Sequence, residues 1–336
     1  MRIAILGAGA WGSALAISLA ANHRIAMWTR DAEARAKLSR DRLSRYLPFA
    51  IPQNVAIADS LEEASRSADL VIVATATSGL RPVAAALARA GETPRLLWAC
   101  KGFDAESRRL PHEIMAEVLP RARDVGALSG PSFADEVARG LPTAVVVASG
   151  APEFAQSTAV ALNTPRLRFY TSADVKGVEL GGGLKNVIAI AAGISDGLEL
   201  GRNARAALVT RGLAEMVRLG VALGGQAETF MGLTGLGDLV LTCTGDLSRN
   251  RAVGLGLARG QPLQEVLIQL GHVAEGVHSA RAAREHARGC GVEMPITEAV
   301  CAVLFEGASP RDAVQKLLAR DPRPEWAPGA GTGSAQ

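Results

Sequence analysis

The feature that most constrains this 336-residue chain is a glycine-rich turn close to its N-terminus. Gly7, Gly9 and Gly12 directly follow the apolar run 3–6 and precede a helical pattern over 13–21. Glycines at this spacing let the backbone turn tightly and approach a pyrophosphate, which the positive end of the following helix attracts. A tight turn without a ligand has the same spacing, but the context of strand, turn and helix favours a dinucleotide site.

The first half of the chain alternates short apolar runs with helical patterns, which predicts βαβ units and a parallel sheet. The runs are nearly continuous in apolar residues, as in strands that helices cover on both faces. We therefore predict an α/β, Rossmann-type doubly wound sheet. The expected strands are residues 3–6, 24–28, 70–74, 96–99, 125–128, 144–148 and 167–170.

After about residue 178, long helical patterns replace the strand runs. They cover residues 179–197, 203–223, 275–288, 295–305 and 310–318. We predict an NAD(P)-binding domain over 1–178 and an all-helical substrate and catalytic domain over 179–320. The stretch 321–336 is rich in Pro, Gly, Ala and Ser, and we expect it to be a disordered tail.

Charge, cysteine spacing and hydropathy exclude several protein classes. A formal net charge of +3 without a long Lys/Arg run predicts a small ligand and no nucleic acid. The N-terminus runs straight into a strand, and the apolar run 187–192 is far shorter than the ~18 residues that span a membrane. The expected location is cytoplasmic. The cysteines are too far apart for a zinc or disulfide framework; they are Cys100, Cys243, Cys290 and Cys301.

The end of the second expected strand bears on the choice between NADH and NADPH. An acid there binds the ribose 2′-hydroxyl, whereas an arginine binds a 2′-phosphate. This strand ends in Thr29-Arg30-Asp31, so Arg30 occupies the phosphate-reading place and Asp31 fits the cap of the next helix. We predict NADPH as the preferred cofactor, with NADH as the alternative, since Arg30 could equally be a solvated loop residue.

Two lysines, rather than a histidine, are the candidates for the proton donor that carbonyl reduction requires. Lys101 follows the strand 96–99, at the sheet edge where ligands bind in such folds. Lys185 lies in a helix that is otherwise apolar enough to be buried, and burial would lower its pKa; the alternative is a lysine that reaches the surface. The histidines lie in charged or loop-like contexts and are interpreted as surface residues; they are His23, His112, His272, His278 and His286.

A third polar group follows in the second half. Asp238, in Gly235-Leu236-Gly237-Asp238-Leu239, could pair with one of the lysines. Ser248, Arg249 and Asn250 offer hydroxyl, guanidinium and amide donors, a combination that suits a phosphate. The alternative is a capped helix start with exposed arginines.

Together these segments resemble the bacterial NAD(P)-dependent glycerol-3-phosphate dehydrogenases, from residue 1 to about 318. The most specific stretches are 183–193 and 229–239. Three shorter motifs occur in matching order: Cys100-Lys101-Gly102, Ser129-Gly130-Pro131-Ser132-Phe133-Ala134 and Ser248-Arg249-Asn250-Arg251. The resemblance implies reversible reduction of dihydroxyacetone phosphate to sn-glycerol 3-phosphate for glycerophospholipid synthesis. It also implies a helical domain like that of 6-phosphogluconate dehydrogenase, and a homodimer.

The resemblance further implies roles for single residues. Lys185 would donate and accept the proton, Lys101 would contact substrate and nicotinamide, and Asp238 would orient the lysine or a substrate hydroxyl. The substrate site would also include Gly130, Ser132, Ser248, Arg249 and Asn250. The implied cofactor contacts are Gly7, Gly9, Ala10, Trp11, Gly12, Arg30, Lys101, Ala134, Arg249, Val273 and Glu275.

The chain departs from the family pattern at three places. Ala10 stands where relatives often have Ser, Ala76-Thr77-Ser78 replaces a Pro-Ser-His, and Gly182 replaces an Ala. None of these changes involves Lys101, Lys185, Asp238 or Arg249, so we expect activity to be intact.

Two other functions have the same general plan. A related two-domain reductase, such as a ketopantoate reductase or 3-hydroxyacid dehydrogenase, binds a carboxylate and would not need the phosphate cluster at 248–250. A non-catalytic NAD(P)-binding sensor would keep the glycine turn, but it has no reason to keep Lys185 and Asp238 in a polar pocket.

Overall fold

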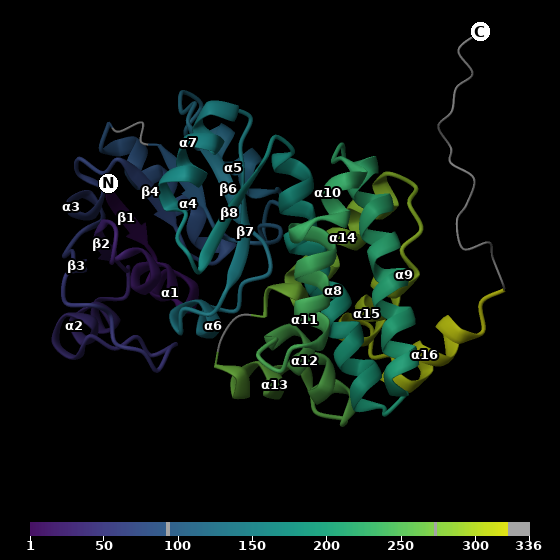
Figure 1. The fold of residues 1–336 in the computed structure, drawn as a ribbon. Helices are drawn as coiled ribbons and strands as arrows, with labels where there is room; N and C mark the ends of the chain where they lie inside the picture. The colour runs from purple at the N-terminus through teal and green to yellow at the C-terminus, as the bar shows by residue number, and fades with distance from the viewer. Residues whose placement is uncertain (92–94, 272–273, 322–336) are drawn as a thin grey trace, which may run out of the picture.

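One sheet of eight strands organises the N-terminal half of the chain, and helices cover both of its faces (Figure 1). The computed structural model describes residues 1–91, 95–271 and 274–321. The strands lie in the order β3-β2-β1-β4-β5-β6-β7-β8. Their bounds are β1 Arg2–Leu6, β2 Arg24–Trp28, β3 Ala56–Ile57, β4 Leu70–Val73, β5 Leu96–Trp98, β6 Val125–Ser129, β7 Thr143–Ala148 and β8 Leu167–Ser172. The helices of this half are α1 Ala10–Leu19, α2 Ala32–Asp41, α3 Leu61–Ser65, α4 Thr77–Arg89, α5 Pro111–Val118, α6 Ala134–Ala138 and α7 Pro152–Leu162.

The alternation of side chains along β1 shows why the central strands are apolar throughout, unlike the edge strand β8, which alternates buried and exposed residues. Ile3 and Ile5 belong to the core on one face of the sheet, whereas Ala4 and Leu6 belong to the core on the other. Successive side chains of a strand point to opposite faces, so a strand that is covered on both sides needs apolar residues at every position. This confirms the doubly wound α/β sheet.

Two features of the sheet differ from the prediction. The two-residue strand β3 was not predicted, because so short a segment has no apolar pattern. β7 pairs antiparallel with β6, and β8 runs parallel to β7, so the sheet is not parallel throughout. The segment between β6 and β7 holds only the five-residue helix α6, too little for the crossover that a parallel neighbour requires. The loop at 130–133 therefore lies at the edge of the sheet where β6 ends.

The C-terminal half is helical, with α8 as its central element (Figure 1). The five long predicted helices are confirmed, with ends within four residues of those expected; the short helices between 227 and 270 were missed. The elements are α8 Val175–Gly197, α9 Gly201–Ala222, α10 Ala227–Met231, a π-helical turn Leu233–Gly237, α11 Asp238–Thr244, α12 Arg249–Ala258, α13 Leu263–Leu270, α14 Glu275–Gly289, α15 Pro295–Phe305 and α16 Pro310–Leu318. Except for Asp321, the expected tail 321–336 lies outside the described residues.

Helix α8 is the one helix of the described ranges that is long and apolar enough to cross a membrane by length and composition. Its apolar window is 94% buried inside the protein. The helices packed around it account for this burial, so its apolar character reflects its place in the core of the helical domain.

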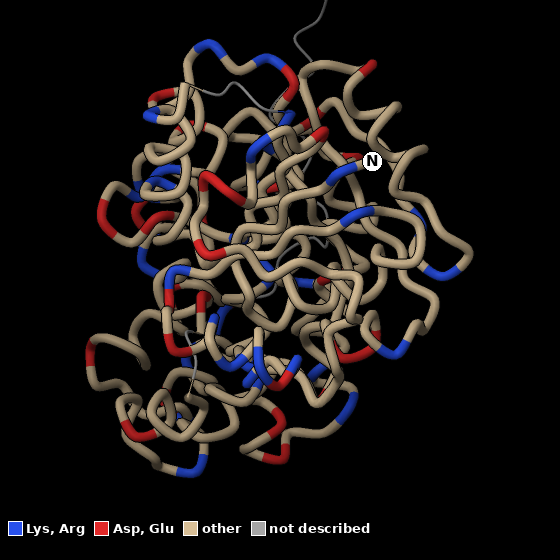
Figure 2. The backbone as a smooth tube through the Cα atoms, turned by 90° about the vertical axis from the view of Figure 1, so that its left-hand side faces the viewer, with Lys and Arg blue, Asp and Glu red and all other residues tan. Residues whose placement is uncertain are grey.

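Charged residues of both signs are interspersed along the chain (Figure 2). Several form exposed pairs, such as Arg81 with Glu117 at 2.7 Å and Arg288 with Glu298 at 2.9 Å. Exposed pairs of this kind typically contribute less than ~1 kcal/mol each. The stability of the fold therefore depends mainly on its apolar cores.

Candidate active site

The glycine turn fits a dinucleotide pyrophosphate. Gly7 has a φ of +124°, and a Cβ on Gly12 would lie 1.9 Å from the Gly7 carbonyl oxygen, so neither position accommodates a side chain. Gly9 faces open space and precedes α1, whose first turn no side chain caps. The unpaired N–H groups of that turn and the helix dipole can hold an anion.

Arginines gather at the end of β2, where the adenosine ribose binds in such folds. Arg30 is exposed there, Arg35 donates a hydrogen bond to the Thr29 carbonyl oxygen at 2.9 Å, and Arg45 lies 3.6 Å from Asp31. Asp31 accepts a hydrogen bond from the Ala34 N–H at 3.0 Å and so caps α2, as predicted. The end of β2 therefore carries arginine side chains, while the Asp31 carboxylate is engaged in capping α2. Such an arrangement suits the binding of a 2′-phosphate.

The remaining predicted cofactor contacts come from both halves of the chain. Ala10, Trp11 and Ala134 pack against the same core of the sheet domain. Glu275 begins α14; burial raises its pKa, while the charges of Arg249, Lys101 and Lys185 act in the opposite direction. Glu275 therefore lies among the cations of the site. Val273 lies outside the described residues.

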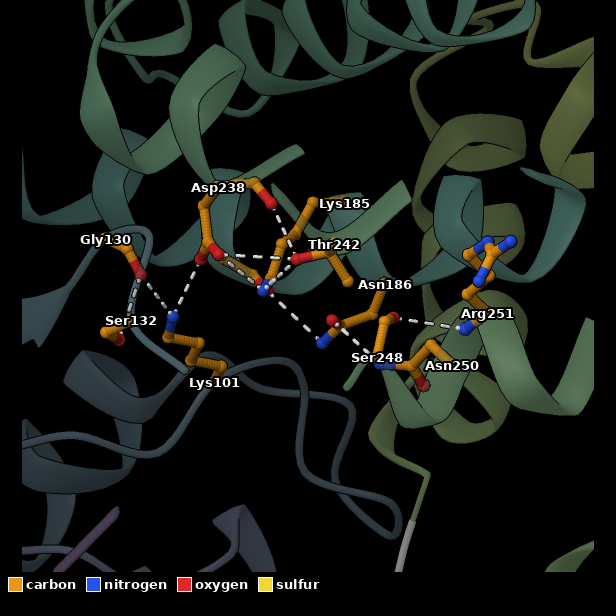
Figure 3. A network of polar contacts seen from close by, with 11 residues as sticks. Lys101, Gly130, Ser132, Lys185, Asn186, Asp238, Thr242, Ser248, Asn250 and Arg251 are labelled. Atoms are coloured by element: carbon orange, nitrogen blue, oxygen red, sulfur yellow. Dashed lines mark hydrogen bonds and ion pairs between the residues drawn. The ribbon is translucent and has the colours of Figure 1, made fainter. Parts of the chain in front are cut away.

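The two candidate lysines meet at one carboxylate (Figure 3). Lys185 Nζ lies 2.7 Å from Asp238 Oδ1 and 2.8 Å from Thr242 Oγ1. Lys101 Nζ lies 2.7 Å from Asp238 Oδ2 and donates to the Gly130 carbonyl oxygen at 2.9 Å. Asp238 thus bridges a lysine of the sheet domain and a lysine of the helical domain.

Burial sets the electrostatics of this cluster. Lys185 is only 7% exposed, so it does not reach the surface. Burial and the nearby charge of Lys101 lower the pKa of Lys185 to about 8, against the opposing attraction of Asp238. Burial alone would raise the pKa of Asp238, but the two lysines hold it below its ordinary value. The carboxylate is ionised, and the Lys185 ammonium loses its proton as pH rises through about 8.

Close backbone packing brings the 248–250 segment to the lysines. A Cβ on Gly193 of α8 would lie 2.0 Å from the Arg251 carbonyl oxygen, so this part of α12 lies directly against α8. Asn250 donates to Asn186 Oδ1 at 2.9 Å and accepts from the Gly276 N–H at 3.0 Å. Asn250 therefore connects α12 to α8 and α14. It uses one of the two hydrogens of its side-chain amide for these contacts.

The start of α12 combines a helix cap with an exposed cation. Ser248 Oγ accepts a hydrogen bond from the Arg251 N–H at 3.2 Å, a cap that does not use the hydroxyl hydrogen. Arg249 is exposed, whereas Arg251 is turned to Asp196, with Nε 2.8 Å from Oδ2. The capped helix start with an exposed arginine is confirmed, whereas the phosphate site stays a prediction; Ser248 itself is only 4% exposed.

The loop after β6 completes the cluster. The Gly130 carbonyl oxygen accepts from Ser132 Oγ at 3.2 Å as well as from Lys101. Of the family departures, Thr77 donates to the Lys101 carbonyl oxygen at 3.0 Å, so the altered loop supports that lysine. A Cβ on Gly182 would lie 3.0 Å from Ser129 Oγ, so the missing methyl group leaves room for this hydroxyl.

Two parts of the site were missed in the sequence. Thr242, one helical turn after Asp238, contacts Lys185 and donates to the Asp238 carbonyl oxygen at 2.6 Å; the i,i+4 spacing is the signal that could have revealed it. The interpretation of His112 as a surface residue is wrong, because its side chain is 27% exposed and pairs with Glu179 at 2.5 Å. His272 lies outside the described residues.

The chain matches two family models in succession. Residues 2–155 match the N-terminal model of NAD-dependent glycerol-3-phosphate dehydrogenase, and residues 174–315 match the C-terminal one. Among curated proteins, glycerol-3-phosphate dehydrogenase [NAD(P)+] of Janthinobacterium sp. (strain Marseille) is 54% identical over 332 residues, covering 97% of this chain and 100% of the relative. The enzyme of the same name from Thiobacillus denitrificans is also 54% identical, with the same coverage.

Solved structures agree with these matches. A crystal structure of glycerol-3-phosphate dehydrogenase from Coxiella burnetii superposes with a TM-score of 0.91 at 40% identity, covering 95% of this chain and 99% of that one. A ketopantoate reductase from Ralstonia eutropha superposes with a TM-score of 0.59 at 16% identity, covering 94% of this chain and 100% of that one. The latter likeness extends to the fold alone.

Proposed function

This chain belongs to the NAD-dependent glycerol-3-phosphate dehydrogenase family, and on that premise we propose how its residues carry out the reaction. The protein is an oxidoreductase that reduces dihydroxyacetone phosphate to sn-glycerol 3-phosphate with NAD(P)H, in reversible fashion. Its product fits a role in glycerophospholipid synthesis. The ketopantoate reductase and 3-hydroxyacid dehydrogenase alternatives are not favoured. The observation that carries the proposed mechanism is the Lys101–Asp238–Lys185 cluster.

Lys185 is the proposed proton donor. When bound, the nicotinamide supplies the hydride for the substrate carbonyl carbon. Lys185 Nζ, held by Asp238 and Thr242, donates a proton to the carbonyl oxygen in reduction and takes it back in oxidation. Lys101, fixed by Asp238 and Gly130, would add positive charge where the oxyanion develops and would contact both substrate and nicotinamide.

The proposed phosphate site is the start of α12. Arg249 and the Ser248 hydroxyl bind the phosphate, the spare amide hydrogen of Asn250 adds a donor, and Gly130 and Ser132 line the opposite side. The proposed cofactor contacts are those of the sequence analysis: Gly7, Gly9, Ala10, Trp11, Gly12, Arg30, Lys101, Ala134, Arg249, Val273 and Glu275.

The assay that tests this function follows NADPH and NADH oxidation with dihydroxyacetone phosphate, and with ketopantoate as the comparison substrate. We expect activity with the phosphorylated ketone alone. Activity with ketopantoate and none with dihydroxyacetone phosphate would overturn the assignment.

Replacing Arg249 with alanine should raise KM for dihydroxyacetone phosphate ~10- to 100-fold, the expected loss for a charge-assisted phosphate contact. The KM of non-phosphorylated dihydroxyacetone should change much less. Steady-state kinetics on both substrates measure this, and Arg259→Ala is the control at the exposed opposite end of the same helix. Equal losses on both substrates would argue against phosphate contact.

Replacing Arg30 with alanine should raise KM for NADPH ~10-fold or more, while KM for NADH should stay nearly unchanged, because only NADPH carries the 2′-phosphate. Wild-type enzyme should accordingly prefer NADPH. Arg24→Ala, on the exposed opposite end of β2, is the matched control. A wild-type preference for NADH would contradict the proposed role of Arg30 in binding the 2′-phosphate.

The two domains are proposed to meet at residue 178, giving 1–178 and 179–320. In support, Val178 packs with the sheet core and Leu180 with the helical core. We further propose a cytoplasmic homodimer that uses the helical domain, where Leu200 and Val221 leave apolar surface exposed. Sedimentation at several protein concentrations tests the dimer.

A further inference from the structure

We propose that Glu179 is a positioning residue for the reaction, because it binds both ends of the segment that carries Lys101 to the helix that carries Lys185. The proposal rests on the lysine roles given above and adds to them a residue that makes no contact with either lysine's ammonium group. Glu179 lies in α8, six residues before Lys185, and is 4% exposed.

The first end of the segment is Trp98, the last residue of β5. Its indole Nε1–H donates to Glu179 Oε1 at 2.7 Å, and the ring is buried. Lys101 follows three residues later, after the strand has ended. A buried indole N–H without an acceptor is costly, so this bond fixes where β5 ends relative to α8.

The second end is His112, in the first turn of α5. Its backbone N–H donates to Glu179 Oε1 at 2.9 Å, and its ring Nδ1 lies 2.5 Å from Glu179 Oε2. The N–H is one of those that a helix start leaves without an intrahelical partner. The carboxylate from α8 therefore takes part in capping α5 and fixes where the segment after Lys101 rejoins a regular element.

The buried carboxylate has the donors that it needs. Burial raises the pKa of Glu179, and the hydrogen bonds from His112 and Trp98 oppose this rise. Burial alone would lower the pKa of His112, but Glu179 brings it above the ordinary value. Both oxygens of the carboxylate are used, and the three donors come from two elements of the sheet domain.

The consequence concerns the distance between the two lysines. Lys101 is held at its backbone by Thr77 and at its Nζ by Gly130 and Asp238, but the course of its segment is set by Trp98 and His112. Gly102 also packs against α8, where a Cβ on Gly183 would lie 2.9 Å from the Gly102 Cα. Without Glu179 this contact would remain, but the segment would lose the hydrogen bonds that fix its two ends to α8. Misplacement of a catalytic group by about 1 Å can cost ~100-fold in rate.

The test compares Glu179→Met with Glu179→Gln. Glutamine keeps an acceptor oxygen for Trp98 and the His112 N–H, whereas methionine fills the space without accepting hydrogen bonds. We expect Glu179→Met to lower kcat for dihydroxyacetone phosphate reduction ~10- to 100-fold with little change in NADPH Kd, and Glu179→Gln to recover most of it. Trp98→Phe removes the indole donor, and His112→Ala removes the ring contact while the backbone N–H of residue 112 keeps its bond to Glu179; each should give a smaller loss.

The pH profile supplies a readout that a loss of stability alone would not change. Lys101 lowers the pKa of Lys185, while Asp238 and Glu275 raise it. If the Lys101 segment loosens in Glu179→Met, the fall of kcat with rising pH should move to higher pH by about half a unit or more. Glu179→Gln should restore the wild-type midpoint.

Glu215→Met is the matched control, because Glu215 is equally buried and accepts bonds from Ile296 N–H at 2.6 Å and Thr297 N–H at 3.1 Å, but touches neither lysine segment. The Glu215→Met variant should lose stability without a shift of the pH midpoint.

The inference is overturned if Glu179→Met keeps the wild-type kcat and pH midpoint, or if Glu215→Met shifts them equally. If Glu179→Met does not fold, Trp98→Phe and the double variant Trp98→Phe/His112→Ala decide by the same two readouts. Wild-type enzyme that fails to reduce dihydroxyacetone phosphate would instead overturn the function itself.

Discussion

Replacing Lys185 with alanine should lower kcat for dihydroxyacetone phosphate reduction by roughly two to four orders of magnitude, the usual contribution of a general acid. The side chain is the buried ammonium next to Asp238 and Thr242, and within the described chain its neighbour Lys101 is committed to Asp238 and Gly130. Lys101 therefore should not replace it as the proton donor. NADPH affinity should stay nearly intact, because the glycine turn lies on the sheet domain.

The measurement pairs steady-state kinetics with NADPH binding followed by cofactor fluorescence. Lys176→Ala is the control, since Lys176 lies on the same helix outside the Lys101–Asp238–Lys185 cluster. Near wild-type turnover in Lys185→Ala would remove this lysine from the mechanism. Loss of NADPH binding in parallel with turnover would point to a structural effect instead.

The same residue predicts the pH dependence of wild-type enzyme. Reduction needs the protonated lysine, and the pKa of Lys185 is lowered from 10.5 to about 8. As pH rises through about 8, the protonated fraction falls, so kcat for reduction should decline tenfold per unit above it. Oxidation of glycerol 3-phosphate needs the neutral amine and should rise over the same interval. A reduction rate that stays flat to pH 10 would contradict the assignment.

Much of the fold could be predicted from local sequence. The strands β1, β2 and β4 to β7 are short, mainly apolar runs, and such runs are visible without knowledge of their neighbours. β8 instead alternates buried Leu167 and Phe169 with exposed Arg168 and Tyr170. The direction in which a strand runs relative to its neighbour is not visible, because an apolar run looks the same in a parallel and in an antiparallel pair. β7, which pairs antiparallel with β6, is the example. Among the short helices between 227 and 270, α12 contains Gly254, which packs closely against α8 but weakens the helical pattern. Helices α10, α11 and α13 have only five, seven and eight residues, which is too short for a clear period.

The residues of the site likewise divide into those that a local pattern reveals and those that it does not. Lys185 could be found because a charge inside an apolar helix is conspicuous, and Asp238 because it follows closely spaced glycines. Glu179 and His112 could not, since each has an ordinary place at a helix start, and their partnership joins residues that are 67 positions apart. A local pattern carries no information on such a contact. The burial that makes it strong arises only when the two domains pack together.

Replacing Asp238 with asparagine should lower both activity and stability, because it removes the one carboxylate that both lysines share. An amide has nearly the same shape but a single acceptor oxygen, so it can bind one ammonium well while its NH₂ group faces the other. We expect kcat to fall ~1000-fold and the free energy of unfolding to drop by about 3–5 kcal/mol, the typical loss when one partner of a buried ion pair is removed.

The pH dependence of unfolding distinguishes this loss from simple disruption. In Asp238→Asn the buried Lys185 lacks its counter-charge, so its pKa in the folded state falls further below the ordinary lysine value. Between those two values the unfolded chain binds more protons than the folded one, and stability therefore rises with pH. Urea unfolding at several pH values should show the deficit shrinking as pH increases. Asp246→Asn, whose carboxylate is exposed and paired with Arg251 at 3.1 Å, should change stability by less than ~1 kcal/mol. A deficit in Asp238→Asn that does not change with pH would mean that repacking around the amide, and not two unpaired ammonium groups, is the source of the loss.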